Sequence, residues 1–176
     1  MTRGHLVVVD MQRVFGDPSS PWATPGFGAI VPTVTALVTA FGADVTFTRF
    51  VAPDQPQGAW VDYYAHWPFA LQPPAAPLWE LAAGFAGPTV DATTFSKWGS
   101  GLAARVCDAT LVLCGVSTDC CVLSTALAAA DAGVRVRVVA DACAGVDESS
   151  HRRTLEILAL YGPLVEVVTS TDLAAG

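Results

Sequence analysis

Three side chains with complementary chemistry stand far apart in the sequence, and each lies where an element can hold it in place. Asp10 closes the apolar run LVVVD, Lys97 lies in TTFSKWGSG, and Cys121 lies in GVSTDCCVLSTA. A thiol at a helix start can take part in acyl transfer, and a carboxylate held after a buried strand can accept a proton. These residue types therefore indicate acyl transfer, provided that the fold brings them together.

Cys121 belongs to the stretch 115–126, where a strand is expected to end and an apolar helix to begin. Thr118 or Asp119 can cap this helix. A cysteine in the first turn has its thiolate stabilised by the positive end of the helix dipole, and nearby backbone N–H groups can hold an oxyanion. The simpler interpretation, a small buried apolar residue, is adopted for three other cysteines: Cys107, Cys114 and Cys143.

Asp10 and Lys97 each have a simpler interpretation as well. An acid after a buried strand is held at the edge of the sheet as a proton acceptor, but it can equally cap a loop N–H group. By itself, Lys97 fits an ordinary exposed lysine, although the chain has only nine Lys and Arg residues.

Apolar runs alternate with helical patterns along the chain, which predicts a three-layer α/β/α, Rossmann-like fold with a mostly parallel sheet of about six strands. We expect one domain over residues 1–176. Strands are expected at 5–9, 43–47, 89–92, 110–114, 134–140 and 164–168, and helices at 30–40, 77–83, 119–132 and 148–160.

Two segments rich in proline and aromatic residues, 17–26 and 54–77, are expected to be long loops that follow strands. Ligands of open α/β sheets bind beyond the carboxyl ends of the strands, which such loops can reach.

Composition restricts the partners. Nine Lys and Arg against 16 Asp and Glu give a formal charge of −7 without a basic stripe, which argues against nucleic acid and anionic membranes. No apolar run approaches a membrane span. Five cysteines without a zinc spacing indicate free thiols and a cytoplasmic location.

Together these motifs resemble the isochorismatase-like, or cysteine hydrolase, superfamily, which includes nicotinamidases, N-carbamoylsarcosine amidases and ureidoacrylate amidohydrolases. LVVVDMQRVF resembles its first strand, FSKWGSGL its lysine motif, and GVSTDCCVLSTALAAADAGVRVRVVADACAG its longest motif, in the family order. The resemblance implies a hydrolase that cleaves an amide or ureido-type C–N bond through a thioester.

Residue by residue, the resemblance implies that Cys121, rather than Cys120, is the nucleophile, with Asp10 as general base and Lys97 as third member of the triad. It also implies a cis peptide between Val116 and Ser117 and an oxyanion hole made by the N–H groups of Ser117 and Cys121.

The family's metal motif is missing from FTRFVAPDQPQGAW, so we expect no metal and no cofactor. Arg49 can bind a substrate carboxylate or carbonyl, or pair with Asp54 or Asp62. His151 is expected on an exposed helix start. Five aromatic residues are candidates for the substrate pocket, or alternatively for the core or an interface: Phe15, Trp22, Trp60, Tyr64 and Trp98.

Two other functions stay open: an isochorismatase-type ether hydrolase, for which the cysteine would be superfluous, and a thiol redox or non-catalytic binding protein that uses the Cys120–Cys121 pair. The expected partner is a small molecule, and family members commonly form homodimers or homotetramers.

Overall fold

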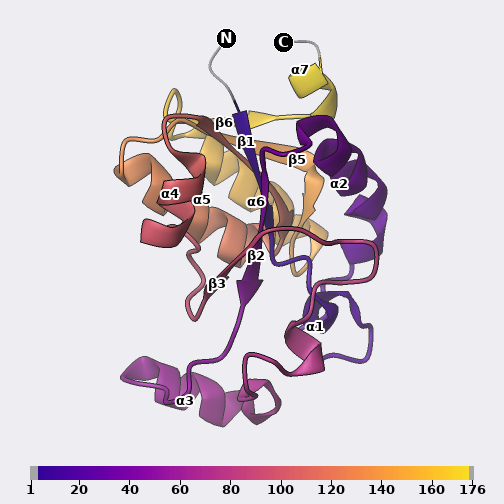
Figure 1. Cartoon of the computed structure of the whole chain (residues 1–176), viewed down its shortest axis with the longest axis vertical. Coiled ribbons are helices and arrows are strands. Elements are labelled where there is room, and N and C mark those ends of the chain that lie inside the picture. Colours follow the sequence, from indigo (N-terminus) through magenta and orange to yellow (C-terminus); the bar gives the residue numbers. More distant parts are fainter. Residues whose placement is uncertain (1–3, 175–176) are drawn as a thin grey trace.

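In the computed structural model, which describes residues 4–174, six strands form one all-parallel sheet flanked by helices, which confirms the expected fold class (Figure 1). The strand order reverses between β1 and β4, and a parallel α/β sheet binds ligands at such a point. In spatial order the strands are β3 (Thr89–Ala92), β2 (Val45–Phe50), β1 (Gly4–Val9), β4 (Thr110–Val116), β5 (Val136–Ala144) and β6 (Val165–Val168).

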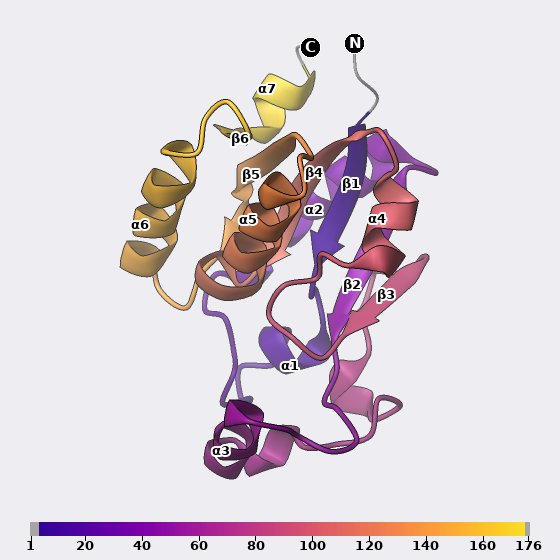
Figure 2. The ribbon, with the colours of Figure 1, turned by 90° about the vertical axis from the view of Figure 1, so that its left-hand side faces the viewer.

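Helices cover both faces of the sheet, because the strands are apolar on both sides. Leu6 and Val8 of β1 pack in the cluster that includes α2, whereas Val7 and Val9 pack with α4, α5 and α6. Figure 2 shows α2 behind the sheet and α4 and α5 in front of it. The helices are α2 (Phe27–Phe41), α4 (Ser100–Val106), α5 (Leu123–Asp131) and α6 (Glu148–Ala159).

Short elements gather beyond the carboxyl ends of the strands, where the arrows in Figure 1 point. They come from the two segments after β1 and β2. Among residues 4–174, no helix is long and apolar enough to cross a lipid bilayer. The remaining short helices are α1 (Arg13–Gly16), α3 (Ala59–His66), η1 (Pro68–Ala70), η2 (Pro77–Trp79) and, after β6, α7 (Ser170–Ala174).

Two expectations for the middle of the chain were wrong. The segment 54–77 is not a plain loop, because it contains α3 and η1. The helix expected over 77–83 is only the 3₁₀ turn η2. The chain then extends so that Leu81 pairs with Gln12 in an antiparallel bridge and the Ala82 N–H donates to the Met11 carbonyl at 2.8 Å. Tertiary pairing with the segment after β1 therefore overrides the local helical pattern.

Other differences concern boundaries and missed helices, since the short helices α1 and α7 were not expected either. β2 and β5 begin two residues later than expected and continue farther, and α4 was not expected. The helix expected over 119–132 consists of a wide π-helical turn, η3 (Thr118–Val122), followed by α5. Wide turns of this kind are frequent at functional sites.

Gly115 permits a close approach of β1 and β4 just before η3. Its φ is +109°, and a Cβ added there would overlap the backbone of Val9. Only glycine adopts this conformation and leaves this space. The carboxyl ends of the two central strands, and the residues that follow them, are thereby held side by side.

Candidate active site

Asp10 directly follows β1, and its side chain is completely buried. Its backbone φ of 48° lies in the left-handed region, which aspartate tolerates better than most residues. The hydroxyl of Thr48 in β2 accepts the Asp10 N–H at 3.2 Å and donates to Oδ1 at 2.7 Å. One neighbour on the adjacent strand thus fixes both the backbone and the carboxylate.

Lys97 lies between β3 and α4, and its ammonium group reaches the same carboxylate. Nζ is 2.9 Å from Asp10 Oδ2, and neither side chain has exposed surface. Nζ also donates to the Thr94 carbonyl at 2.9 Å and lies 4.7 Å from the centre of the Phe50 ring. A buried ion pair needs such additional partners, because each charge has lost its water.

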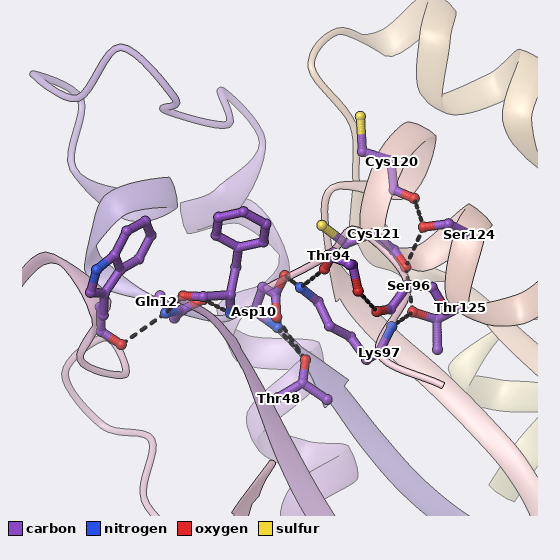
Figure 3. A network of polar contacts seen from close by, with 12 residues as sticks. Asp10, Gln12, Thr48, Thr94, Ser96, Lys97, Cys120, Cys121, Ser124 and Thr125 are labelled. Carbon is purple, nitrogen blue, oxygen red and sulfur yellow. Dashed lines mark hydrogen bonds and ion pairs between the residues drawn. The ribbon is translucent and has the colours of Figure 1, made fainter. Parts of the chain in front are cut away.

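Cys121 lies in η3, between β4 and α5, and only 4% of its surface is exposed. The Thr125 hydroxyl donates to its carbonyl at 2.6 Å and accepts the Lys97 N–H at 2.9 Å, so one buried hydroxyl joins the two segments. Figure 3 shows the Cys121 sulfur directed toward Asp10 and Lys97, and the Cys120 sulfur directed elsewhere. The structure therefore brings Asp10, Lys97 and Cys121 together.

Burial raises the pKa of the Cys121 thiol well above its usual range. The nearby Lys97 ammonium lowers this pKa, whereas the Asp10 charge, the hydrogen bond to Asp10 and the neighbouring Cys120 raise it further. The expectation of a thiolate stabilised by a helix start was wrong, because the sulfur is desolvated. A raised pKa favours the protonated thiol, and the sulfur is directed toward Asp10 (Figure 3).

The capping role expected for Thr118 or Asp119 was also wrong. The residue before η3 is Ser117, and no side chain caps the turn. The Thr118 hydroxyl instead pairs with His151 Nδ1 at 2.9 Å. Asp119 Oδ1 accepts the Ser117 hydroxyl at 3.0 Å and the Val146 N–H at 2.9 Å. These contacts fasten η3 to α6 and to the loop between β5 and α6.

His151 differs from its expected exposed position, since it is partly buried behind η3 and bonded to Thr118. Ser117 is buried, and the peptide bond between Val116 and Ser117 is cis. Ser117 and Cys121 both line the cavity described below.

Gln12 is a structural residue of the site that was not among the predicted site residues, although it lies in the stretch LVVVDMQRVF. Its buried amide donates to the carbonyls of Phe50 and Trp79 at 2.9 and 2.8 Å and accepts the Phe50 N–H at 2.8 Å. The chain after Asp10 is thereby tied to the end of β2 and to η2.

A cavity of about 380 Å³ opens beside Cys121. Ser117, Cys120 and Cys121 line it from η3. Two of the pocket candidates, Phe15 and Trp22, line it, together with aromatic residues that were not singled out for the pocket. The aromatic lining consists of Phe15, Trp22, Phe50, Tyr63, Trp67 and Phe95.

Four candidates for the pocket do not line this cavity. Arg49 forms a two-point ion pair with Asp91 on β3, at 2.8 and 2.6 Å, rather than with Asp54 or Asp62. The three aromatic candidates lie behind or beside the cavity. Trp60 packs against three rings, those of Phe50, Tyr63 and Phe95. Tyr64 is buried behind Trp60 and Tyr63, and Trp98 lines a separate hollow next to β3.

The missed lining residues Tyr63 and Trp67 come from the aromatic-rich segment that was expected to reach the site. The number of aromatic residues in a segment can indicate that the segment contributes to a pocket. It does not show which face of α3 is directed toward the cavity.

The residues at this site do not fit a metal ion. Among residues 4–174, no three His, Cys, Asp or Glu side chains converge as ligands. Asp10 is paired with Lys97, and Asp91 is paired with Arg49. A zinc or iron site requires several such side chains around one point.

The family model described as "Isochorismatase domain" matches residues 5–172. A search of curated proteins gave no match. Among solved structures, a cysteine hydrolase from Pseudomonas syringae pv. phaseolicola 1448A is 23% identical with a TM-score of 0.85, and the match covers 98% of this chain and 91% of that one.

Two amide hydrolases are also similar. Pyrazinamidase of Pyrococcus horikoshii, in complex with zinc, is 24% identical with a TM-score of 0.76, covering 95% of this chain and 99% of that one. The nicotinamidase and pyrazinamidase of Acinetobacter baumanii is 25% identical with a TM-score of 0.75, covering 98% and 99%.

Proposed function

The chain belongs to the isochorismatase family of hydrolases, and we propose that it uses Cys121 to cleave the C–N bond of a small amide or ureido-type molecule through a thioester. One observation carries this proposal. The buried Asp10–Lys97 pair, with a separation of 2.9 Å, stands beside a thiol that lines a cavity. A nucleophile, a base and a compensating cation are the groups that acyl transfer requires.

In the first step, Asp10 accepts the proton of Cys121 as the sulfur bonds to the substrate carbonyl carbon. The backbone N–H groups of Ser117 and Cys121 stabilise the resulting oxyanion. Asp10 then returns the proton to the substrate nitrogen, the C–N bond breaks, and ammonia or an amine leaves. The acyl group remains on sulfur as a thioester.

In the second step, Asp10 accepts a proton from water, whose oxygen attacks the thioester carbon. The C–S bond breaks, the acid product forms, and Asp10 returns the proton to the sulfur of Cys121. Lys97 acts throughout as the positive partner of the carboxylate. Without it, a buried negative charge would be left alone, which is costly in a region without water.

The raised pKa of the Cys121 thiol supports proton transfer that accompanies attack rather than a thiolate formed beforehand. Cys120 lacks this arrangement. Burial and the adjacent Asp119 raise the pKa of its thiol to about 11, and its sulfur lies 3.7 Å from Asp119 Oδ2. The difference between the two thiols is the Asp10–Lys97 pair, which stands beside Cys121 and can receive its proton, so Cys121 is the better nucleophile.

The test combines turnover with trapping of the intermediate. The protein is incubated with a panel of primary amides and ureido compounds, ammonia release is measured, and acid-quenched samples are analysed by peptide mass spectrometry. We expect an acyl adduct on the peptide at Cys121. The Cys121→Ala variant should lose turnover and adduct, whereas the matched variant Cys120→Ala should keep most of both. Equal losses in the two variants would contradict the assignment of the nucleophile.

A further inference from the structure

The cavity beside Cys121 has no charged wall. Among the described residues that line it there is no Asp, Glu, Lys, Arg or His. Asp10 and Lys97, beside Cys121, are paired with each other and have no exposed surface.

Asp119 contacts the lining residues Ser117 and Cys120, but as a carboxylate it offers an anion no counter-charge. Arg49, the cation that was expected to bind a carboxylate, is engaged by both oxygens of Asp91 and does not line the cavity.

The polar lining is concentrated near the nucleophile. Ser117, Cys120 and Cys121 are contributed by η3 and the residue before it. Tyr63 also lines the cavity, and burial is the main cause that raises the pKa of its phenol. A substrate carbonyl and nitrogen can therefore meet polar groups near the sulfur, in addition to the hydroxyls of Thr24 and Tyr63 in the lining.

Most of the remaining lining is aromatic. Trp22 is held by ring contacts with centroid distances of 6.1 Å to Phe15, 5.9 Å to Tyr63 and 6.2 Å to Trp67. Such a wall binds apolar groups by removing them from water, and it offers a buried anion no compensation. The volume of about 380 Å³ is at the small end of ligand sites, which suits a single ring.

We propose that the substrate is an uncharged primary amide with an apolar, ring-sized acyl group, and that amides carrying a carboxylate are rejected. This inference rests on the proposed function, because it assumes that Cys121 attacks an amide. It follows from the pairing of Arg49 and Lys97 with their own carboxylates, which leaves a substrate anion in the cavity without a counter-charge.

The lack of charged residues in the cavity lining also favours product release. Hydrolysis of R–CO–NH₂ with one water gives R–COOH and NH₃, and proton transfer between them gives R–COO⁻ and NH₄⁺. The product thus acquires a negative charge at the end of the cycle, in a cavity that does not stabilise it. The reaction converts a well-bound neutral amide into a poorly bound anion, so the carboxylate is expected to be a weak inhibitor.

The test compares three primary amides: benzamide, 4-carbamoylbenzoate, which is the same ring with a carboxylate, and acetamide. Ammonia release is used to obtain kcat/KM. We expect benzamide to exceed 4-carbamoylbenzoate by about 100-fold or more, since burying an unpaired charge is costly. Benzamide should also exceed acetamide, mainly through a lower KM.

A charge placed at the rim should relax this selectivity. Val146 lines the cavity and is 52% exposed, so a longer polar side chain can be accommodated. In Val146→Lys, the ratio of kcat/KM for benzamide over 4-carbamoylbenzoate should fall by about tenfold or more. The control Val61→Lys adds the same charge at an exposed residue of α3 outside the lining, and it should leave the ratio unchanged.

The outcomes separate the two proposals. Turnover of 4-carbamoylbenzoate equal to or faster than that of benzamide, with dependence on Cys121, would overturn the substrate class and leave the hydrolase intact. Turnover of acetamide without that of benzamide would do the same. Absence of ammonia and of a Cys121 adduct with every amide would overturn the proposed function itself.

Discussion

The hydroxyl of Thr48 is bonded twice to Asp10: it accepts the backbone N–H and donates to the carboxylate. Asp10 has a left-handed backbone conformation, so its direction is not fixed by the regular pairing of β1. The two hydrogen bonds of Thr48 fix the orientation of Asp10, which the pairing of β1 does not do. They leave Oδ2 to face Lys97 Nζ at 2.9 Å. We infer that Thr48 is a positioning residue for Asp10, the proposed general base.

The variant Thr48→Val keeps the shape of the side chain and removes both hydrogen bonds. We expect a fall in kcat of about 10–100-fold with little change in KM, because the base is misplaced and substrate contacts remain. Unfolding in urea should show a loss of about 1–3 kcal/mol, since a buried N–H and a carboxylate oxygen lose their partner. Thr48→Ser retains the hydroxyl and should restore most of kcat. A serine variant as slow as the valine variant would argue against positioning.

Removal of one charge of the buried pair should harm stability as well as activity. Lys97→Met leaves the Asp10 carboxylate without its cation, and the free energy of unfolding should fall by about 3–5 kcal/mol. The double variant Asp10→Asn/Lys97→Met removes both charges, so it should be more stable than Lys97→Met while remaining inactive. Chemical denaturation measures all three proteins. A double variant that is less stable than Lys97→Met would contradict this account of the pair.

Gly145 tests the connection between η3 and the loop after β5. A Cβ at this position would lie 2.5 Å from Asp119 Oδ1 and 3.1 Å from the Cβ of His151. Gly145→Ala should therefore displace Asp119 and slow turnover by about 10–100-fold. In the control Gly28→Ala, in α2, the added methyl group meets nothing within 4 Å, and turnover should be unchanged. Unfolding curves show whether the loss in Gly145→Ala reflects the site or the whole fold.

Alkaline pH should destabilise the protein through its buried thiols. Burial raises the pKa of Cys143 to about 12, whereas a thiol in an unfolded chain titrates near ~8.5. Below ~8.5 the thiol is neutral in both states, and between there and 12 only the unfolded chain releases the proton. Stability therefore falls with rising pH in this window, by up to about 1.4 kcal/mol per pH unit for this group.

Urea unfolding under reducing conditions at pH 7, 8, 9 and 10 measures this slope. Cys143→Ala should flatten it, whereas Cys107→Ala, which removes an exposed thiol, should leave it unchanged. The same slope in wild type and Cys143→Ala would indicate that other groups control alkaline unfolding. Cys120 and Tyr64, whose pKa values are raised by burial to about 11 and about 12, act in the same direction.

Much of the architecture could be predicted from local pattern. The stretches LVVV before Asp10 and LVLC after Thr110 are apolar at every position, as a strand covered on both faces requires. The helical patterns between such runs predicted the parallel sheet. The order of the motifs around Asp10, Lys97 and Cys121 identified the family, because that order reflects the sequence in which strands reach the same edge of the sheet.

Tertiary structure alone decided how the site works. The partners Thr48 for Asp10, Asp91 for Arg49 and Thr125 for Lys97 are separated by 28 to 42 residues, and no local periodicity encodes such pairs. Burial is also a property of the assembled fold, so the raised pKa of Cys121 was opposite to what its place near a helix start indicated. The sequence determines which chemical groups are present. Their solvation, their charge partners and the orientation of the aromatic rings are determined only when distant segments pack together.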